Sequence, residues 1–169
     1  MKFQLKAIKF YESMSEETNC FQGKLYINNK YVADVKNTGQ GGNTDVYHLN
    51  KLTGSIISEA EKYLSHQPKK KCDVYDFEYI RTIESEVDDL FADWLKVKAD
   101  KKFEKEMDKG ILYGKDKKYS YYIQPYNVPI KAMLMSVKGK EILRNKILEI
   151  QQGGNIVFNT NIPDDVMGK

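Results

Sequence analysis

A glycine-rich loop is the part of the sequence whose residues could most readily do chemistry. Residues 37–45 read Asn-Thr-Gly-Gln-Gly-Gly-Asn-Thr-Asp. Consecutive backbone N–H groups in such a loop can form a nest that binds a phosphate or another anion. The spacing departs from both common phosphate motifs, because no Gly-Lys-Ser/Thr follows and the last glycine of G-x-G-x-x-G is missing. Two interpretations stay open: a ligand site, or a structural loop that needs positive φ angles.

Two titratable side chains follow the loop closely and complete a candidate ligand site. This site consists of Gly39, Gly41, Gly42, Asp45 and His48, and it would serve a nucleotide- or phosphate-binding protein or enzyme. Residues three apart on a strand point to opposite faces, so a shared metal or acid–base role of the Asp and His is not expected. A structural or surface histidine is the favoured interpretation of His48.

The sequence offers little else for catalysis or for a bound metal. Cys20 and Cys72 have no C-x-x-C spacing, and with two histidines they make an unusual zinc set. No serine lies in a G-x-S-x-G elbow. Asp88 and Asp89 are adjacent on a predicted helix and indicate a solvated acidic face. We therefore predict no catalytic residue, no cofactor and no metal, and an enzyme is not the favoured interpretation.

A second candidate surface combines tyrosines with lysines in a predicted hairpin. Its residues are Lys115, Lys117, Lys118, Tyr119, Tyr121 and Tyr122. Tyrosine is enriched at protein–protein interfaces, and aromatic rings among lysines can also bind nucleic acid without reading its sequence. The chain has only two arginines, which disfavours a sequence-specific reader of nucleic acid. The alternative is a two-sided hairpin with one tyrosine face packed and the other half exposed.

Hydrophobic periodicity predicts the elements that position these residues. Apolar and polar residues alternate over 2–10, 21–27 and 31–35, which indicates three strands, the last two joined by a hairpin turn at Asn28-Asn29-Lys30. A short fourth strand is expected at 46–49. Helical spacing begins near Ser55 and ends before Pro68.

The second half of the chain is predicted to hold the longest helix. Apolar residues keep helical spacing from Thr82 to Lys109, and Gly110 marks the end of the helix. A second hairpin over 111–113 and 119–124 follows. Pro129 opens a helical region that Gly139 interrupts, and a further helix ends at Gly153-Gly154. A strand over 155–159 and a mobile tail from residue 163 complete the chain.

This order predicts an α+β fold with a largely antiparallel sheet packed against one long and several shorter helices. There is no regular βαβ alternation, no repeat and no linker. One domain over residues 1–169 is the favoured organisation, with 69–71 as the alternative place for a boundary.

Length and composition suit a globular protein. The 169 residues are 41% hydrophobic and 30% charged, with a formal net charge of +3. No run of about 20 apolar residues is available for a bilayer-spanning helix, and the N-terminal residues alternate where a signal peptide would be continuously apolar. We expect a cytoplasmic protein without a membrane partner.

Several short segments resemble small bacterial and phage proteins that have no established activity. The resemblance rests on Phe-Tyr-Glu-Ser-Met-Ser-Glu-Glu-Thr at 10–18, the hairpin at 25–30 with its glycine-rich loop, Val-Asp-Asp-Leu-Phe at 87–91 and Asn-Thr-Asn-Ile at 159–162. It implies a binder or inhibitor of a host system, such as an anti-CRISPR or other anti-defence protein, acting in the host cytoplasm if phage-encoded. The expected function is a non-catalytic protein-binding domain, and nonspecific nucleic-acid binding is a weaker alternative.

Overall fold

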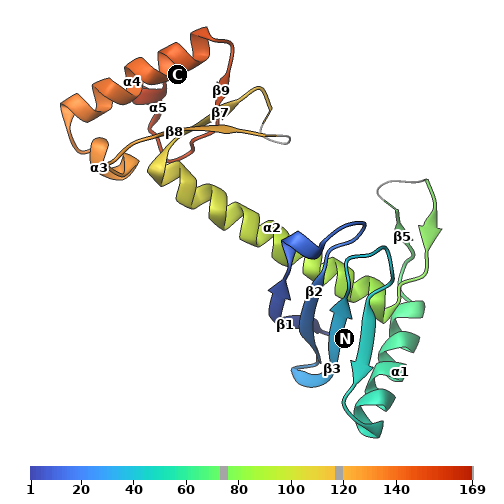
Figure 1. Cartoon of the computed structure of the whole chain (residues 1–169). Coiled ribbons are helices and arrows are strands. Elements are labelled where there is room, and N and C mark those ends of the chain that lie inside the picture. Colours follow the sequence, from blue (N-terminus) through green and yellow to red (C-terminus); the bar gives the residue numbers. More distant parts are fainter. Residues whose placement is uncertain (73–75, 117–119, 169) are drawn as a thin grey trace. The chain divides into compact units, whose positions relative to one another are not determined.

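A computed structural model describes residues 1–72, 76–116 and 120–168 (Figure 1). It confirms the predicted α+β class, because antiparallel sheets pack with helices, one of them long. Residue contacts group the chain into two compact units, Met1–Leu95 and Lys96–Lys169. The boundary lies inside the long helix and not near residues 69–71. The expectation of one domain over 1–169 stays a prediction.

The first unit is built on a four-stranded antiparallel sheet. Its strands are β1 (Phe3–Phe10), β2 (Phe21–Ile27), β3 (Lys30–Asn37) and β4 (Asp45–His48), and they lie in chain order. A 3-10 helix, η1 (Glu12–Met14), lies between β1 and β2. The predicted turn is confirmed: Asn28 and Asn29 have φ of 48° and 66°, a region that Asn tolerates better than most residues.

Two helices cover this sheet, and the first begins earlier than the sequence predicted. α1 runs over Lys51–Ser65 because Asn50 caps it. The Asn50 side chain accepts a bond from Thr53 N at 3.1 Å, and the Thr53 hydroxyl accepts from Asn50 N at 2.9 Å, which closes a capping box. A two-strand ladder, β5 (Lys70–Lys71) and β6 (Glu78–Tyr79), lies between α1 and the long helix.

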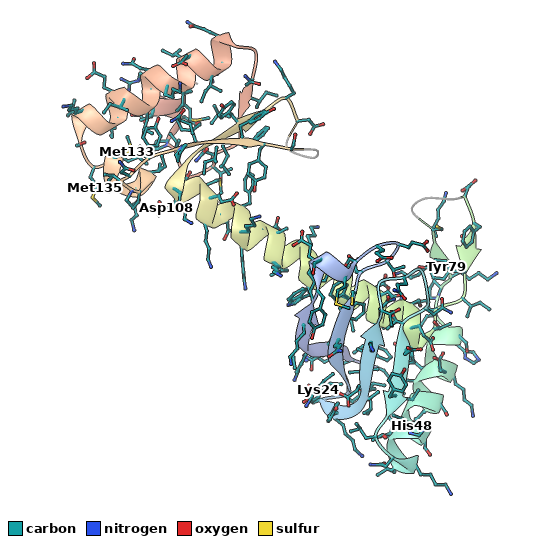
Figure 2. All side chains as sticks on the ribbon, viewed as in Figure 1. Lys24, His48, Tyr79, Asp108, Met133 and Met135 are labelled. Carbon is teal, nitrogen blue, oxygen red and sulfur yellow. The ribbon has the colours of Figure 1, made fainter. Side chains whose placement is uncertain are left out.

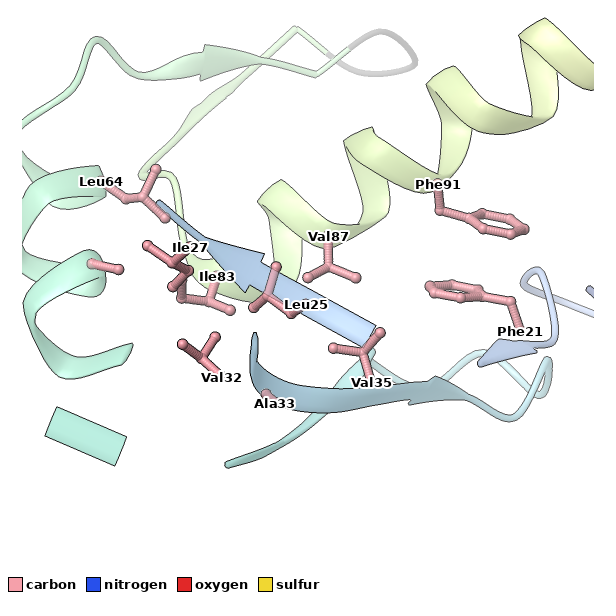
Figure 3. Close-up of a cluster of buried hydrophobic side chains, with 11 residues drawn as sticks. Phe21, Leu25, Ile27, Val32, Ala33, Val35, Leu64, Ile83, Val87 and Phe91 are labelled. Carbon is pink, nitrogen blue, oxygen red and sulfur yellow. The ribbon is translucent and has the colours of Figure 1, made fainter. Parts of the chain in front are cut away.

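The long helix α2 (Ile83–Lys109) matches the predicted 82–109 closely. Its first part and α1 bury their apolar side chains against β2 and β3 (Figure 3). The Phe91 and Phe21 rings lie face to face in Figure 3. Their centroids are 3.9 Å apart, and the rings are stacked. Stacked aromatic pairs contribute to stability beyond the apolar area that they bury.

The second unit contains a three-stranded antiparallel sheet in the order β8-β7-β9. The strands are β7 (Gly110–Gly114), β8 (Tyr122–Pro125) and β9 (Ile156–Val157), and the helices are α3 (Ile130–Met133), α4 (Val137–Gln152) and α5 (Asp164–Met167). β7 is buried on both faces. Ile111 packs with α3, α4 and α5, whereas Leu112 packs with the end of α2.

Two expectations for this unit are wrong. Gly139 does not interrupt a helix: it lies in the first turn of α4, and the break falls at residues 134–136. A Cβ at Gly139 would lie 2.2 Å from the Met133 carbonyl oxygen, so the glycine permits α4 to approach α3 closely. The tail from Pro163 is packed, because Val166 and Met167 of α5 are buried.

Among the described residues, no helix combines the length and the low polarity that crossing a bilayer would demand.

Candidate functional site

One buried side chain, Asn37, holds the glycine-rich loop of the first unit. Its Oδ1 accepts bonds from Gly39 N and from the Thr18 hydroxyl, both at 2.9 Å. Its Nδ2 donates to the Gly42 carbonyl at 3.2 Å and to Thr44 Oγ1 at 3.1 Å. Every polar atom of this amide therefore has a partner, as a buried amide requires.

Two of the three candidate glycines adopt a backbone that favours glycine. Gly39 and Gly41 have φ of 85° and 82°. A Cβ at Gly39 would lie 2.3 Å from the Met14 carbonyl oxygen, and one at Gly41 would lie 2.2 Å from the Glu17 carboxylate. Gly42 has open space around the corresponding position. The first two glycines are thus explained by loop geometry alone.

Two of the amides that would form an anion nest are bonded inside the protein. Gly39 N donates to Asn37, and Gly41 N donates to the Thr18 hydroxyl at 3.3 Å. The Gly39 carbonyl accepts from three successive amides, those of Glu16, Glu17 and Thr18. The loop is therefore tied to the segment that follows η1, which supports the structural interpretation over the anion site.

Carboxylates line both grooves beside the loop. Gly41 and Gly42 border a groove of about 430 Å³ that Glu17 and Asp88 also line. A neighbouring groove of about 600 Å³ has Asp45, Glu84 and Asp88 in its wall. Negative side chains oppose the binding of a phosphate. Neither groove suits the anionic ligand that the loop suggested.

The remaining two candidate ligand residues are exposed and stand at the two ends of β4. The Asp45 carboxylate accepts a 3.0 Å bond from the Tyr47 hydroxyl, which raises the pKa of Tyr47. A Cβ at Gly54 would lie 3.4 Å from His48 Cδ2, so the imidazole lies against the first turn of α1 (Figure 2). His48 lines neither groove as far as the described residues extend. The structure does not gather the five candidate ligand residues into one site.

Asp88 is more than part of a solvated acidic face. Its Oδ1 accepts a bond of 2.5 Å from the Thr44 hydroxyl, although the residue keeps an exposed side. Burial raises the pKa of Asp88, the Thr44 bond lowers it, and the nearby Asp89 and Glu84 raise it further. The sequence carried no signal for this contact, because Thr44 comes from a loop that is remote in the chain.

The tyrosine-rich hairpin of the second unit separates its two described candidate tyrosines. Tyr121 is half-buried, and its ring packs edge-on against Phe103 with centroids 5.2 Å apart. Its hydroxyl donates to Glu106 at 2.5 Å, and this bond raises the pKa of Tyr121. Tyr121 is thus a packing residue of its own unit, as the alternative of a hairpin with one packed tyrosine face describes, and its role toward a partner stays a prediction.

Tyr122, by contrast, is 66% exposed, and its neighbour Ile123 is 40% exposed. The Tyr122 ring lies beside Tyr113 of β7, its partner across the ladder, with centroids 5.7 Å apart. Within the described residues, β8 forms the edge of its sheet. Successive strand residues point to opposite faces, so this edge strand exposes a large apolar side chain on each face.

Of the three candidate lysines of the hairpin, Lys115 alone lies within the described residues, and it is bonded inside the unit. Lys115 Nζ donates to the Gly154 carbonyl at 2.6 Å, so this lysine ties the hairpin to the turn after α4. Cations stabilise the carbonyl end of a helix in this way. The candidates Lys117, Lys118 and Tyr119 lie outside the described residues.

A metal site finds no support in the part of the chain that the structure describes, where no group of three or more His, Cys, Asp or Glu could hold an ion. Comparison with protein-family models, curated proteins and solved structures finds no match. The α+β class is therefore as far as the fold alone identifies this protein, and function must be inferred from its surfaces.

Proposed function

We propose that the protein is a non-catalytic protein-binding domain, and that the exposed edge of the β7–β8 hairpin contacts the partner. A protein-binding role, together with the resemblance of several segments of the chain to small bacterial and phage proteins, favours an inhibitor of a host defence system. The observation that carries the proposal is the pair Tyr122 and Ile123 on an edge strand.

An edge strand of this kind is suited to protein recognition. Unpaired N–H and C=O groups along an edge can accept a strand from another chain, and exposed aromatic rings supply contact area at a low entropic cost. Proteins usually cover or charge such edges. β8 instead presents tyrosine and isoleucine, with Pro125 at its end limiting the length that can pair.

The glycine-rich loop supports the alternative ligand-binding function less well. Its glycines Gly39 and Gly41 are explained by their positive φ angles and, at Gly39, by the close Met14 carbonyl, and its grooves carry carboxylates. A ligand function would require an anion to displace internal bonds and to approach negative charge.

An affinity pull-down tests the proposal. The tagged full chain is incubated with bacterial lysate, with and without nuclease, and bound proteins are identified by mass spectrometry. The same experiment is run with Tyr122→Ala and with Tyr47→Ala, a tyrosine that is 56% exposed on the edge strand β4 of the other unit. Thermal unfolding of each variant confirms that it folds.

The proposal expects a stoichiometric protein that survives nuclease, is depleted by Tyr122→Ala and is retained by Tyr47→Ala. Recovery of nucleic acid alone, or of a protein lost with nuclease, would instead support the nucleic-acid alternative. A melting temperature that rises with a nucleotide, while no protein is captured, would favour the ligand site.

A further inference from the structure

A second apolar surface of the Lys96–Lys169 unit lies where α3 meets the start of α4. A groove of about 290 Å³ opens here. Its apolar walls are formed by Val128, Ala132, Met133 and Ile142. The Met133 side chain is buried, and Gly139 brings α4 against the end of α3, so the groove has a packed floor.

Apolar side chains of the groove wall, and others next to the groove in the chain, are exposed. Val128 and Ile142 of the wall are 49% and 43% exposed. Ser136 also lines the groove, and its two chain neighbours, Met135 and Val137, are 81% and 87% exposed. Contiguous exposed apolar residues around a depression mark a binding surface more often than a chance feature.

Charge indicates what kind of partner the groove would accept. Lys138 is the one charged residue in the described lining, so the charge of the lining itself is positive. The first turn of α4 has no acidic residue, although acidic residues are favoured at that end of a helix. The whole unit carries 15 Lys and Arg against nine Asp and Glu, whereas residues 1–95 carry 12 against 15.

We infer that this groove docks an acidic segment of the partner protein, which inserts one or two large apolar side chains while a carboxylate of the segment faces Lys138. This inference rests on the proposed protein-binding function and names the chemistry of the partner. The volume lies at the lower end of the range for small-molecule pockets, which suits an anchoring side chain better than a whole cofactor. Insertion of apolar anchors from an amphipathic segment is a common mode of peptide recognition.

Selection from a library of short random peptides, displayed against the folded full chain, tests this inference. The enriched peptides are synthesised, and their affinity is measured by fluorescence anisotropy. The variants are Ile142→Asp, which places a carboxylate in the apolar wall, and Lys138→Glu, which reverses the one charge of the described lining. Leu148→Asp is the matched control, because Leu148 is 45% exposed on the same helix outside the groove.

Enriched peptides should combine a large apolar residue with flanking Asp or Glu. Each groove substitution should weaken their binding by about tenfold or more, as the loss of an anchor residue usually does, and Leu148→Asp should change it by less than about twofold. Thermal unfolding checks that each variant is folded. If Ile142→Asp does not fold, Lys138→Glu still tests the groove.

Several results would overturn the inference: no enriched peptide, enrichment of basic or uncharged peptides, binding that ignores both groove substitutions, or a self-association that buries the groove. The experiments distinguish failure of the hairpin proposal from failure of the groove proposal. If the lysate yields a nuclease-resistant partner but acidic peptides do not bind, only the groove proposal fails. If acidic peptides bind in the groove but no protein depends on Tyr122, the hairpin proposal fails.

Discussion

Two buried asparagines, one in each unit, hold irregular backbone in place. Asn37 organises the glycine-rich loop of the first unit. In the second, Asn159 Nδ2 donates to the Met107 and Gly110 carbonyls at 3.1 Å, and its Oδ1 accepts from Leu112 N at 2.7 Å. Each amide satisfies backbone groups that would otherwise be buried without partners, so each fixes where a helix or strand ends.

Replacement of Asn37 should therefore destabilise the protein strongly. We expect Asn37→Ala to lower the free energy of unfolding by about 2 to 4 kcal/mol, because several buried donors and acceptors lose their partner at once. Urea denaturation monitored by circular dichroism measures the change. Asn43→Ala removes the same group at an exposed neighbouring position and should cost less than about 0.5 kcal/mol. Equal losses in the two variants would contradict this role.

The contact between Asp88 and Thr44 gives a prediction about pH. Because burial raises the folded-state pKa of Asp88 above its ordinary 3.8, the folded protein binds the proton more tightly than the unfolded chain does. The charged carboxylate therefore costs stability, and this cost grows as pH rises through the window between 3.8 and the raised pKa. Asp88→Asn keeps an acceptor for the Thr44 hydroxyl without the charge.

We expect Asp88→Asn to be as stable as the parent at neutral pH or slightly more stable, with a difference that shrinks as pH falls toward 3.8. Urea midpoints at a series of pH values follow that difference. A difference that widens on acidification, or a variant clearly less stable at neutral pH, would mean that the charge stabilises the fold.

At the scale of elements, the glycine-rich loop is explained by its own geometry. Gly39→Ala should destabilise the protein by about 2 kcal/mol or more, because a Cβ there meets the Met14 carbonyl and φ is positive. Gly42→Ala should change stability by less than about 0.5 kcal/mol, since the position is open. Thermal unfolding of both variants tests this. Tolerance of alanine at Gly39 would contradict the structure of the loop.

Gly42 is a better position than Gly41 at which to test by substitution whether the loop binds a ligand. Substitution of Gly41 strains the backbone, because its φ is positive, and therefore cannot separate a lost ligand from a damaged fold. A bulky side chain at Gly42 occupies open space beside the groove without that strain. A ligand that still binds when this position is filled does not use the groove.

The C-terminal helix α5 is part of the second core. Met167 is 3% exposed and packs in a cluster with Ile111 and Ile147. We expect Met167→Ala to lower the free energy of unfolding by about 2 kcal/mol or more, through lost apolar contact and the cavity left behind. Denaturation measures it, with Met135→Ala as a control at a residue that is 81% exposed. A loss no greater than that of the control would show that the tail contributes little.

Much of the element pattern could be predicted from the sequence, but the state of individual side chains could not. Alternation gave the hairpin of β2 and β3, and helical spacing gave α2 almost to the residue. The difference between Tyr121 and Tyr122 depends on Phe103 and Glu106 of α2, which no local pattern connects to the hairpin. The tail was wrongly predicted as mobile because its few apolar residues find their partners only in the folded unit.

At the scale of the whole molecule, two compact units differ in charge. Residues 1–95 carry an excess of acidic residues, and residues 96–169 carry an excess of basic ones. The net charge of the chain is small because the two units have net charges of opposite sign. Both proposed contact surfaces, the β8 edge and the groove at α3 and α4, belong to the basic unit. A partner with acidic surfaces would be attracted to that unit at long range.

We propose that a protein partner binds the exposed edge of the hairpin through Tyr122. The most direct test is the dissociation constant of the captured, nuclease-treated partner for the parent chain, Tyr122→Ala and Tyr47→Ala, measured by calorimetry. We expect Tyr122→Ala to weaken binding by about tenfold or more without changing the melting temperature, whereas Tyr47→Ala should leave the affinity unchanged. Equal affinities for all three proteins would contradict it.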